Sequence, residues 1–273
     1  MKNGKKYIFA NLQNAGATIS FTLLLFTAFL AACATPTVSS DDSDDGINSL
    51  SSAELKESFF NPDIDYGSMT DSRDGQVYRT VQIGEQTWMA ENLNFDPGQG
   101  GSRNANYDWS WCYENDPEKC ELFGRFYTWA AAVDSIALYD GGNGVDCGDG
   151  KTCILPEKVQ GVCPDGWHLP TKDEWNILFS VVGGQDNAGK VLRSQTGWYK
   201  GSSGTDDVGF CALPTGTGGD DRFLNFGNRA DFWVASEHVS DRGCNVIMHY
   251  FNDKAGFGNA YKHAGLPVRC VKD

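Results

Sequence analysis

The stretch from Cys163 to Gly184, CPDGWHLPTKDEWNILFSVVGG, contains more mutually consistent local signals than any other part of the sequence. Thr171 and Glu174 match the T-x-x-E capping box, in which the two side chains satisfy backbone N–H groups of the first helical turn. An apolar stripe follows at helical spacing, made by Trp175, Leu178, Phe179 and Val182. The sequence therefore predicts an amphipathic helix over residues 172–182, and two glycines follow it as is common at helix ends.

Working outward, the residues before and after this helix predict an α+β domain over 70–273. The segment VYRTVQIGEQTWM predicts a β-hairpin that turns at Gly84-Glu85. Apolar periodicity predicts a second helix over 126–138 and a short one over 188–194. Strands are expected near 232–236, 245–251 and 267–271. Five tryptophans within these elements are expected in the core: Trp88, Trp129, Trp167, Trp175 and Trp233.

The first 32 residues have the features of an export signal. Three lysines precede an apolar run of about twelve residues, which is too short to span a bilayer and typical of a signal-peptide core. Leu30-Ala31-Ala32-Cys33 resembles a bacterial lipobox, which implies cleavage before Cys33 and lipid on that cysteine. Ala34 stands where an aspartate would retain a lipoprotein at the inner membrane, so the outer membrane is expected. The run DDSDD loosely resembles acidic surface-export tethers, so a surface-exposed position is expected as well. An ordinary signal peptide with a chance cysteine is the alternative.

The residues after Cys33 predict an acidic disordered tether over 33–69, because they are rich in Ser, Thr, Asp and Gly and include the run DDSDD. Within it, residues 53–69 are read either as a short helix or as more linker. Removal of residues 1–32 leaves 19 basic and 36 acidic residues, a net charge of −17. So negative a chain repels phosphate backbones and anionic headgroups, which argues against nucleic acid as a partner and assigns membrane attachment to lipid.

Eight cysteines remain besides Cys33, an even number as a disulfide framework requires. Sequence proximity favours Cys112 with Cys120 and Cys147 with Cys153. Fold logic suggests Cys163 with Cys270 and Cys211 with Cys244. A zinc site is the competing reading, but the sequence has no C-x-x-C and its four histidines are scattered.

Six blocks follow one another along the chain: DGQVYRTVQIGEQTWMAENLN, CELFGRFYTWAAA, CPDGWHLPTKDEW, GFCALPTG, FWVASE and LPVRCVKD. In this order they resemble the Fibrobacter succinogenes major paralogous domain family. The third and last blocks are also similar to the formylglycine-generating enzyme family, whose fold belongs with C-type lectin domains. This resemblance implies two helices beside a small antiparallel sheet, a loop-rich region, and a pairing of Cys163 with Cys270. It implies no assigned reaction.

No catalytic signature is present, and His168 is read as a packed histidine bonded to backbone. Formylglycine-generating catalysis needs two reduced cysteines late in the domain. Here Cys244 and Cys270 are the only late cysteines, and both are read as structural. A formylglycine-generating-like oxidoreductase therefore remains an alternative only.

Two sets of residues are candidates for ligand binding. The lectin analogy suggests a calcium site formed by oxygen ligands near the 232–236 strand: Asp220, Asp221, Asn225, Asn228, Asp231 and Glu237. The second set consists of aromatic residues in polar, glycine-rich surroundings, where a ring face can stack on a sugar: Trp109, Trp111, Trp198 and Tyr199.

Together these features predict a lipid-anchored, disulfide-linked, C-type-lectin-like domain outside the cell. We expect a non-catalytic binding or adhesion module whose ligand is a glycan or a cell-surface protein, presented to variable loops. No cofactor is expected besides calcium. A structural envelope protein without a ligand is a second alternative, favoured if the candidate aromatics are buried.

Overall fold

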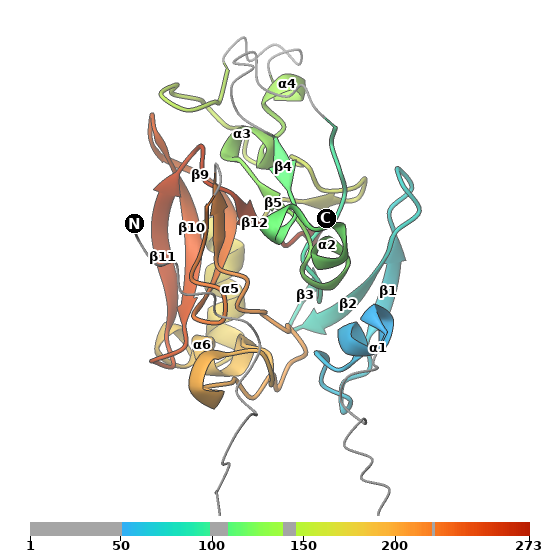
Figure 1. The fold of residues 1–273 in the computed structure, drawn as a ribbon. Helices are drawn as coiled ribbons and strands as arrows, with labels where there is room; N and C mark the ends of the chain where they lie inside the picture. The colour runs from blue at the N-terminus through green and yellow to red at the C-terminus, as the bar shows by residue number, and fades with distance from the viewer. Residues whose placement is uncertain (1–50, 99–108, 139–145, 220–221) are drawn as a thin grey trace, which may run out of the picture. The chain divides into compact units, whose positions relative to one another are not determined.

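Short helices and short antiparallel strands make up the computed structural model, which describes residues 51–98, 109–138, 146–219 and 222–273 (Figure 1). The α-helices are α1 (Ser52–Glu57), α2 (Pro117–Phe123), α3 (Trp129–Ala132), α4 (Ser135–Leu138), α5 (Lys172–Val181) and α6 (Gln185–Leu192). The α+β class is therefore confirmed, with more helices among the described residues than the three predicted over 126–138, 172–182 and 188–194. No helix in these ranges is both long enough and apolar enough to cross a membrane.

The largest sheet has five strands in the order β1-β2-β3-β13-β6. Its strands are β1 (Gly67–Thr70), β2 (Val77–Ile83), β3 (Gln86–Met89), β13 (Val271–Lys272) and β6 (Trp167–His168). Strands β2 and β3 form the predicted hairpin: Ile83 pairs with Gln86, and Gly84 takes the turn at a φ of 61°. Strand β13 pairs with both β3 and β6, so a late segment lies in the middle of the sheet.

A second sheet has the order β11-β10-β9, and α5 and α6 lie beside it (Figure 1). Its strands are β9 (Arg229–Val239), β10 (Arg242–His249) and β11 (Ala255–Tyr261). Strand β9 includes the strand predicted at 232–236, and β10 overlaps the one predicted at 245–251 but begins and ends earlier. Strand β11 was not predicted, because its sequence AGFGNAY is rich in glycine and lacks a run of strand-forming residues.

The remaining strands form two small sheets. One has the order β12-β5-β4, with β12 at Leu266–Pro267, β5 at Phe126–Tyr127 and β4 at Ser110–Trp111. The other is the hairpin of β7 (Thr217–Gly219) and β8 (Arg222–Leu224). A bridge between Gly218 and Gly265 connects β7 to the segment before β12.

Helix α5 confirms the prediction made from the capping box. The Thr171 Oγ accepts a hydrogen bond from the Glu174 N–H at 3.2 Å, and the Glu174 carboxylate accepts from the Thr171 N–H at 2.9 Å. Trp175, Leu178 and Phe179 are buried on one face. The helix ends within one residue of the expected position, and Gly183 follows it at a φ of 92°.

The single helix predicted over 126–138 is wrong. Phe126 and Tyr127 instead pair with β12 and β4, and the Thr128 Oγ caps a new helix by accepting from the Ala131 N–H at 3.3 Å. Asp134 then interrupts the helix with a φ of 49°. The apolar side chains from Phe126 to Val133 are all buried, so helical spacing did not distinguish one long helix from a strand and two short turns.

Residues 51–69 belong to the folded part of the chain, so the expected tether does not extend to 69. Helix α1 begins at a complete capping box formed by Ser51 and Glu54. Phe59 is buried, and the Asn61 side chain donates to the Asp206 carbonyl at 3.0 Å. Of the two readings left open for 53–69, the short helix is therefore the correct one. Cys33 and the rest of the tether lie outside the described residues.

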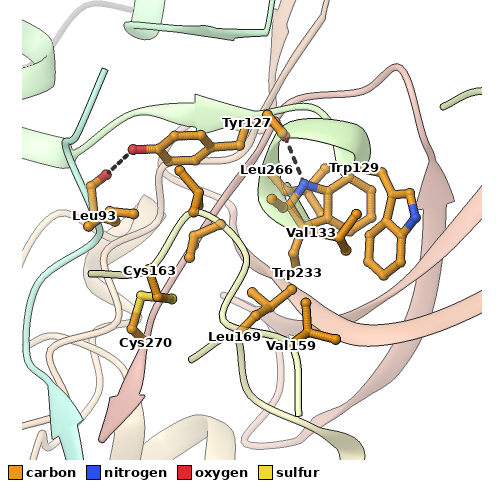
Figure 2. Close-up of a cluster of buried hydrophobic side chains, with 14 of the residues drawn as sticks. Leu93, Tyr127, Trp129, Val133, Val159, Cys163, Leu169, Trp233, Leu266 and Cys270 are labelled. Atoms are coloured by element: carbon orange, nitrogen blue, oxygen red, sulfur yellow. Dashed lines mark hydrogen bonds between the residues drawn. A yellow bond between two sulfur atoms is a disulfide. The ribbon is translucent and has the colours of Figure 1, made fainter. Parts of the chain in front are cut away.

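The core confirms the five tryptophans expected there, since all are at most 6 % exposed. Figure 2 shows one of the buried clusters, which gathers side chains from distant segments around Trp233. The Trp233 indole donates to the Tyr127 carbonyl at 2.7 Å, and the Tyr127 hydroxyl donates to the Leu93 carbonyl at 3.3 Å. These bonds satisfy polar groups that would otherwise be costly to bury.

Three of the four expected disulfides are present: Cys112–Cys120, Cys147–Cys153 and Cys163–Cys270. The fourth expectation is wrong, because Cys211 and Cys244 are free thiols. They belong to different clusters of buried side chains, and the Cys211 thiol donates to the Phe59 carbonyl at 3.3 Å. An even cysteine count therefore did not mean that every cysteine is paired.

Candidate functional site

A cleft of about 690 Å³ lies beside α2 and β4, and we call it the tryptophan cleft. Trp109 and Trp111 line it, as two of the four aromatics expected to bind a sugar. Polar side chains from three other segments line it as well: Gln76, Asn94, Asp96, Asn115, Glu121 and Arg125. Amides, carboxylates and a guanidinium beside an aromatic ring offer the hydrogen bonds and the apolar face that sugar hydroxyls and ring carbons need.

Arg125 is held firmly at one wall of this cleft. Its Nη2 lies 2.9 Å from an Asp96 carboxylate oxygen, and its Nε donates to the Ser110 hydroxyl at 3.1 Å. Its Nη1 lies 3.8 Å from both sulfurs of the Cys112–Cys120 disulfide. The guanidinium is thus positioned before any ligand arrives, which reduces the ordering cost of binding.

The side chains of Asn94 and Gln76 are hydrogen-bonded to each other and are therefore not free to rotate. The Asn94 amide donates to the Gln76 side-chain oxygen at 2.8 Å, and the Gln76 amide donates to the Asn94 carbonyl at 3.1 Å. The Asn94 Oδ1 is buried and accepts no hydrogen bond from the described residues.

Two glycines fix the Trp111 indole. A Cβ on Gly218 would lie 2.4 Å from its Nε1, and a Cβ on Gly265 would lie 2.4 Å from its Cζ2. Any larger residue at either position would displace the ring. Trp111 is only half-buried, whereas Trp109 is 7 % exposed and packs into the core as well as lining the cleft.

The other two candidate aromatics do not lie at this cleft. Trp198 is buried, and its indole donates to the Ser194 hydroxyl at 3.1 Å, so it is a core residue. Tyr199 is 44 % exposed and meets the Tyr250 ring edge-on, with 5.3 Å between centroids. The four aromatics expected to bind a sugar therefore occupy three different environments.

The described members of the expected calcium set do not converge. Asp231 is wholly buried, pairs with Arg229 and accepts from the Asn245 amide at 2.7 Å. Glu237 lies 3.4 Å from the buried Lys262 ammonium and accepts from the Cys153 N–H at 2.8 Å. The two carboxylates are six residues apart on one extended strand, roughly 20 Å.

The other described members of the expected calcium set do not meet at a common point either. Asn225 is exposed at a φ of 64°, and the Asn228 side chain donates to the Phe226 carbonyl at 3.3 Å. No group of three or more His, Cys, Asp and Glu residues in the described ranges is arranged to hold a metal. Asp220 and Asp221 lie outside those ranges, so a calcium site that includes them stays a prediction.

His168 is packed as expected, but its partners are carboxylates and not backbone. Its Nε2 lies 2.7 Å from Glu174 and its Nδ1 lies 2.7 Å from Asp273. Burial lowers the pKa of His168, yet these two hydrogen bonds outweigh burial and raise the pKa overall. With both ring nitrogens bonded, His168 has none left to act as a general base.

The two free thiols are poorly suited to metal or redox chemistry. Cys211 and Cys244 are at most 2 % exposed. Burial raises the pKa of the Cys211 thiol, and the nearby Asp206 carboxylate raises it further. Since the thiolate is the nucleophile and the metal ligand, this environment disfavours both roles for Cys211.

Sequence reasoning found the two tryptophans of the cleft but not its polar side chains. Glu121 lies in helix α2 and Arg125 lies just after it, and no sequence pattern predicted this helix. One signal was available: the Cys112–Cys120 pair was expected from spacing, and it forms part of the wall that holds Arg125.

The family model of the Fibrobacter succinogenes major domain matches residues 81–272 of the chain. Searches of curated proteins and of solved structures found no match. The matched range includes the tryptophan cleft apart from its edge at 74–76.

Proposed function

Because the chain belongs to the Fibrobacter succinogenes major domain family, we propose that it is an exported envelope lipoprotein whose domain binds glycans without catalysing a reaction. Lipid on Cys33 would attach it to the outer membrane, and the acidic residues after Cys33 would hold the domain away from the surface. The fold proposed for this role is C-type-lectin-like. Its support is the α+β class, the small antiparallel sheets and the Cys163–Cys270 link between distant segments.

The tryptophan cleft is the observation that carries this proposal. It combines a half-buried indole, a guanidinium fixed by Asp96 and a row of amides in one concavity large enough for one or two sugar residues. His168, the histidine weighed as a general base, is occupied by two carboxylates. Binding without catalysis is the simplest chemistry for this arrangement.

The experiment is a glycan array followed by calorimetry on the mature protein, using Glu121→Gln and a matched control. Glu121 is exposed and lines the cleft, whereas Glu118 is exposed on the same helix α2 and does not line it. We expect Glu121→Gln to weaken binding of a neutral oligosaccharide about tenfold, as loss of a hydrogen bond to a charged group would do. Glu118→Gln should change the affinity less than twofold.

Absence of any glycan ligand, together with saturable binding to a surface protein, would overturn the proposal. If Glu121→Gln and Glu118→Gln changed the affinity equally, the ligand would bind somewhere other than this cleft. The burial of Trp109 and Trp198 favours the alternative of a structural envelope protein without a ligand. That alternative predicts no saturable binding of any kind.

The two free thiols are the only observation that favours a formylglycine-generating-like oxidoreductase. Such an enzyme needs thiols that react in the folded state. Intact mass after alkylation distinguishes the two readings. The binding module predicts no label on the folded protein and two labels after denaturation, whereas two labels on the folded protein would support the enzyme.

A further inference from the structure

A second cleft, of about 640 Å³, lies between the β7–β8 hairpin and strands β10 and β11, and we call it the arginine cleft. Three arginines line it: Arg222, Arg229 and Arg242. Asn259, Tyr261 and His263 contribute further polar and aromatic groups. No described residue of its lining is an aspartate or a glutamate. Asp220 and Asp221, which precede Arg222, lie outside the described residues.

Six of the eight described arginines already have partners, and one of these six, Arg229, lines the cleft itself. Eight of the nine arginines in the sequence lie in the described ranges. Five of them form ion pairs with carboxylates: Arg73, Arg79, Arg125, Arg193 and Arg229. Arg269 is wholly buried and donates to carbonyl and amide oxygens. Arg222 and Arg242 are the two described arginines left without such a partner.

Both of these unpaired guanidiniums line the same cleft, in a chain whose formal net charge is −14. Carboxylates outnumber cations in this protein, so a surface arginine meets one easily, and the other exposed or half-exposed arginines do. Two arginines without a carboxylate partner among the described residues make the lining of this cleft locally positive in a negative molecule.

Two of the three cations are held in place by their neighbours. The Arg242 guanidinium lies 3.9 Å from the Tyr261 ring centroid, and its Nη1 donates to the Asn259 side-chain oxygen at 3.0 Å. Arg229 is fixed by its Nε bond to the buried Asp231. Each guanidinium keeps further N–H groups that bond to no described residue, and these can donate to the oxygens of a carboxylate or a sulfate group.

The shape and charge of the cleft restrict the ligand. Three cations are too few to follow a nucleic acid backbone, whose binding depends on many phosphate contacts. The net negative charge of the chain repels an anionic bilayer, and a concave site does not fit a flat surface. A single carboxylate or sulfate on a saccharide matches the concavity, and Tyr261 beside it is 46 % exposed although Arg242 and His263 pack on its ring.

We propose that the arginine cleft binds an acidic saccharide through its carboxylate or sulfate group, which Arg222 and Arg242 neutralise. The claim rests on these unpaired arginines and not on the tryptophan cleft. A protein with both sites would hold a neutral stretch of glycan in one cleft and an acidic sugar in the other.

The test is calorimetry of the mature protein with oligogalacturonate, a sulfated oligosaccharide, a neutral oligosaccharide of equal length, and inorganic sulfate and phosphate. Arg222→Gln and Arg242→Gln are compared with Lys190→Gln, which removes one positive charge from an exposed position on α6. We expect at least one acidic oligosaccharide to bind, and each arginine variant to weaken it tenfold or more. Lys190→Gln should weaken it less than twofold.

Several results would overturn this proposal. These are no binding of either acidic oligosaccharide, equal binding of neutral and acidic chains, equal effects of all three variants, or binding of the inorganic anions alone. The Glu121→Gln variant separates this outcome from failure of the tryptophan cleft. If an acidic oligosaccharide still binds the Glu121→Gln variant but no longer binds the Arg242→Gln variant, it binds in the arginine cleft. This conclusion does not depend on whether neutral glycans bind.

Discussion

At the scale of single residues, His168 connects three parts of the fold through two hydrogen bonds. Glu174 uses one carboxylate oxygen for this histidine and the other for the cap of α5, while Asp273 follows strand β13. A neutral imidazole donates from one nitrogen only, so both carboxylates are satisfied only when His168 is protonated. The bridge is therefore a proton-dependent contact between β6, α5 and the end of β13.

We expect His168→Gln to lose most stability at low pH. The folded pKa of His168 is raised above its ordinary value of 6.5, so its stabilisation is complete below that value and is lost as pH rises through the folded pKa. Urea unfolding at pH 5.5 and pH 8.5 should show a larger difference between the parent protein and the variant at the lower pH.

His238→Gln, at an exposed position, is the control and should change stability equally at both pH values. If the parent and the His168 variant gave parallel curves across this range, the proton-dependent bridge would be contradicted. Proximity in the sequence could have suggested the Glu174 contact, six residues away. The Asp273 contact spans 105 residues and had no local signal.

At the scale of elements, two helices begin with the same capping box, and their stabilities can be compared directly. Thr171 and Ser51 form the same reciprocal bonds at the starts of α5 and α1. Helix α5 buries three large side chains, whereas α1 buries none. We expect Thr171→Ala to lower the free energy of unfolding by about 1 kcal/mol, a typical loss for a helix cap.

Ser51→Ala should lower global stability much less, because the fraying of a helix with no buried residue leaves the core intact. Urea unfolding of both variants, followed by tryptophan fluorescence, measures the difference. Equal losses would mean that α1 unfolds together with the core. A negligible loss in Thr171→Ala would mean that burial alone fixes the start of α5.

Local signals predicted those elements whose ends are set by neighbouring residues. The β2–β3 hairpin and α5 belong to this group, since a turn and a cap define them. The chain at 126–138 is different, because its break depends on β12, which is more than 120 residues away. Gly161 also packs there so closely that a Cβ would lie 2.1 Å from the Ala132 carbonyl oxygen. Contacts of that kind leave no periodic pattern in the sequence.

The candidate sites show the same limit. Trp109 and Trp111 could be selected because aromatics in a polar stretch are visible in the sequence. Their exposure depended on what packs over them, and Trp198, chosen by the same rule, is buried. Arg222 and Arg242 attracted no attention, because an unpaired charge is recognised only once every possible partner has been located.

At the scale of the whole molecule, buried titratable groups make stability depend on pH. Burial raises the pKa of Asp206 to about 7 and that of Asp231 to about 6, although Arg229 opposes the second shift. Both pKa values exceed the ordinary value of 3.8. Between pH 3.8 and the raised pKa of each group, the folded protein therefore binds more protons than the unfolded chain. Stability should therefore fall as pH rises from about 4 to 7.

We expect calorimetry to give a higher melting temperature near pH 5 than near pH 8. The net negative charge is smaller at pH 5, and the weaker repulsion acts in the same direction. Below about pH 4 the trend reverses, because hydrogen bonds to His168 hold the pKa values of Glu174 and Asp273 below their ordinary range against the effect of burial. A melting temperature that rises from pH 5 to pH 8 would contradict this assignment of buried acids.

The central position of β13 has a consequence for how the molecule is made. A ribosome or an export channel delivers the chain from its amino end, so β2, β3 and β6 emerge long before residues 271–272. Until then the edge of β3 has no partner on that side, and Cys163 has no Cys270 to join. The largest sheet therefore cannot close until the last strand is delivered, and a chain cut short by only a few residues would lose the strand that joins β3 to β6.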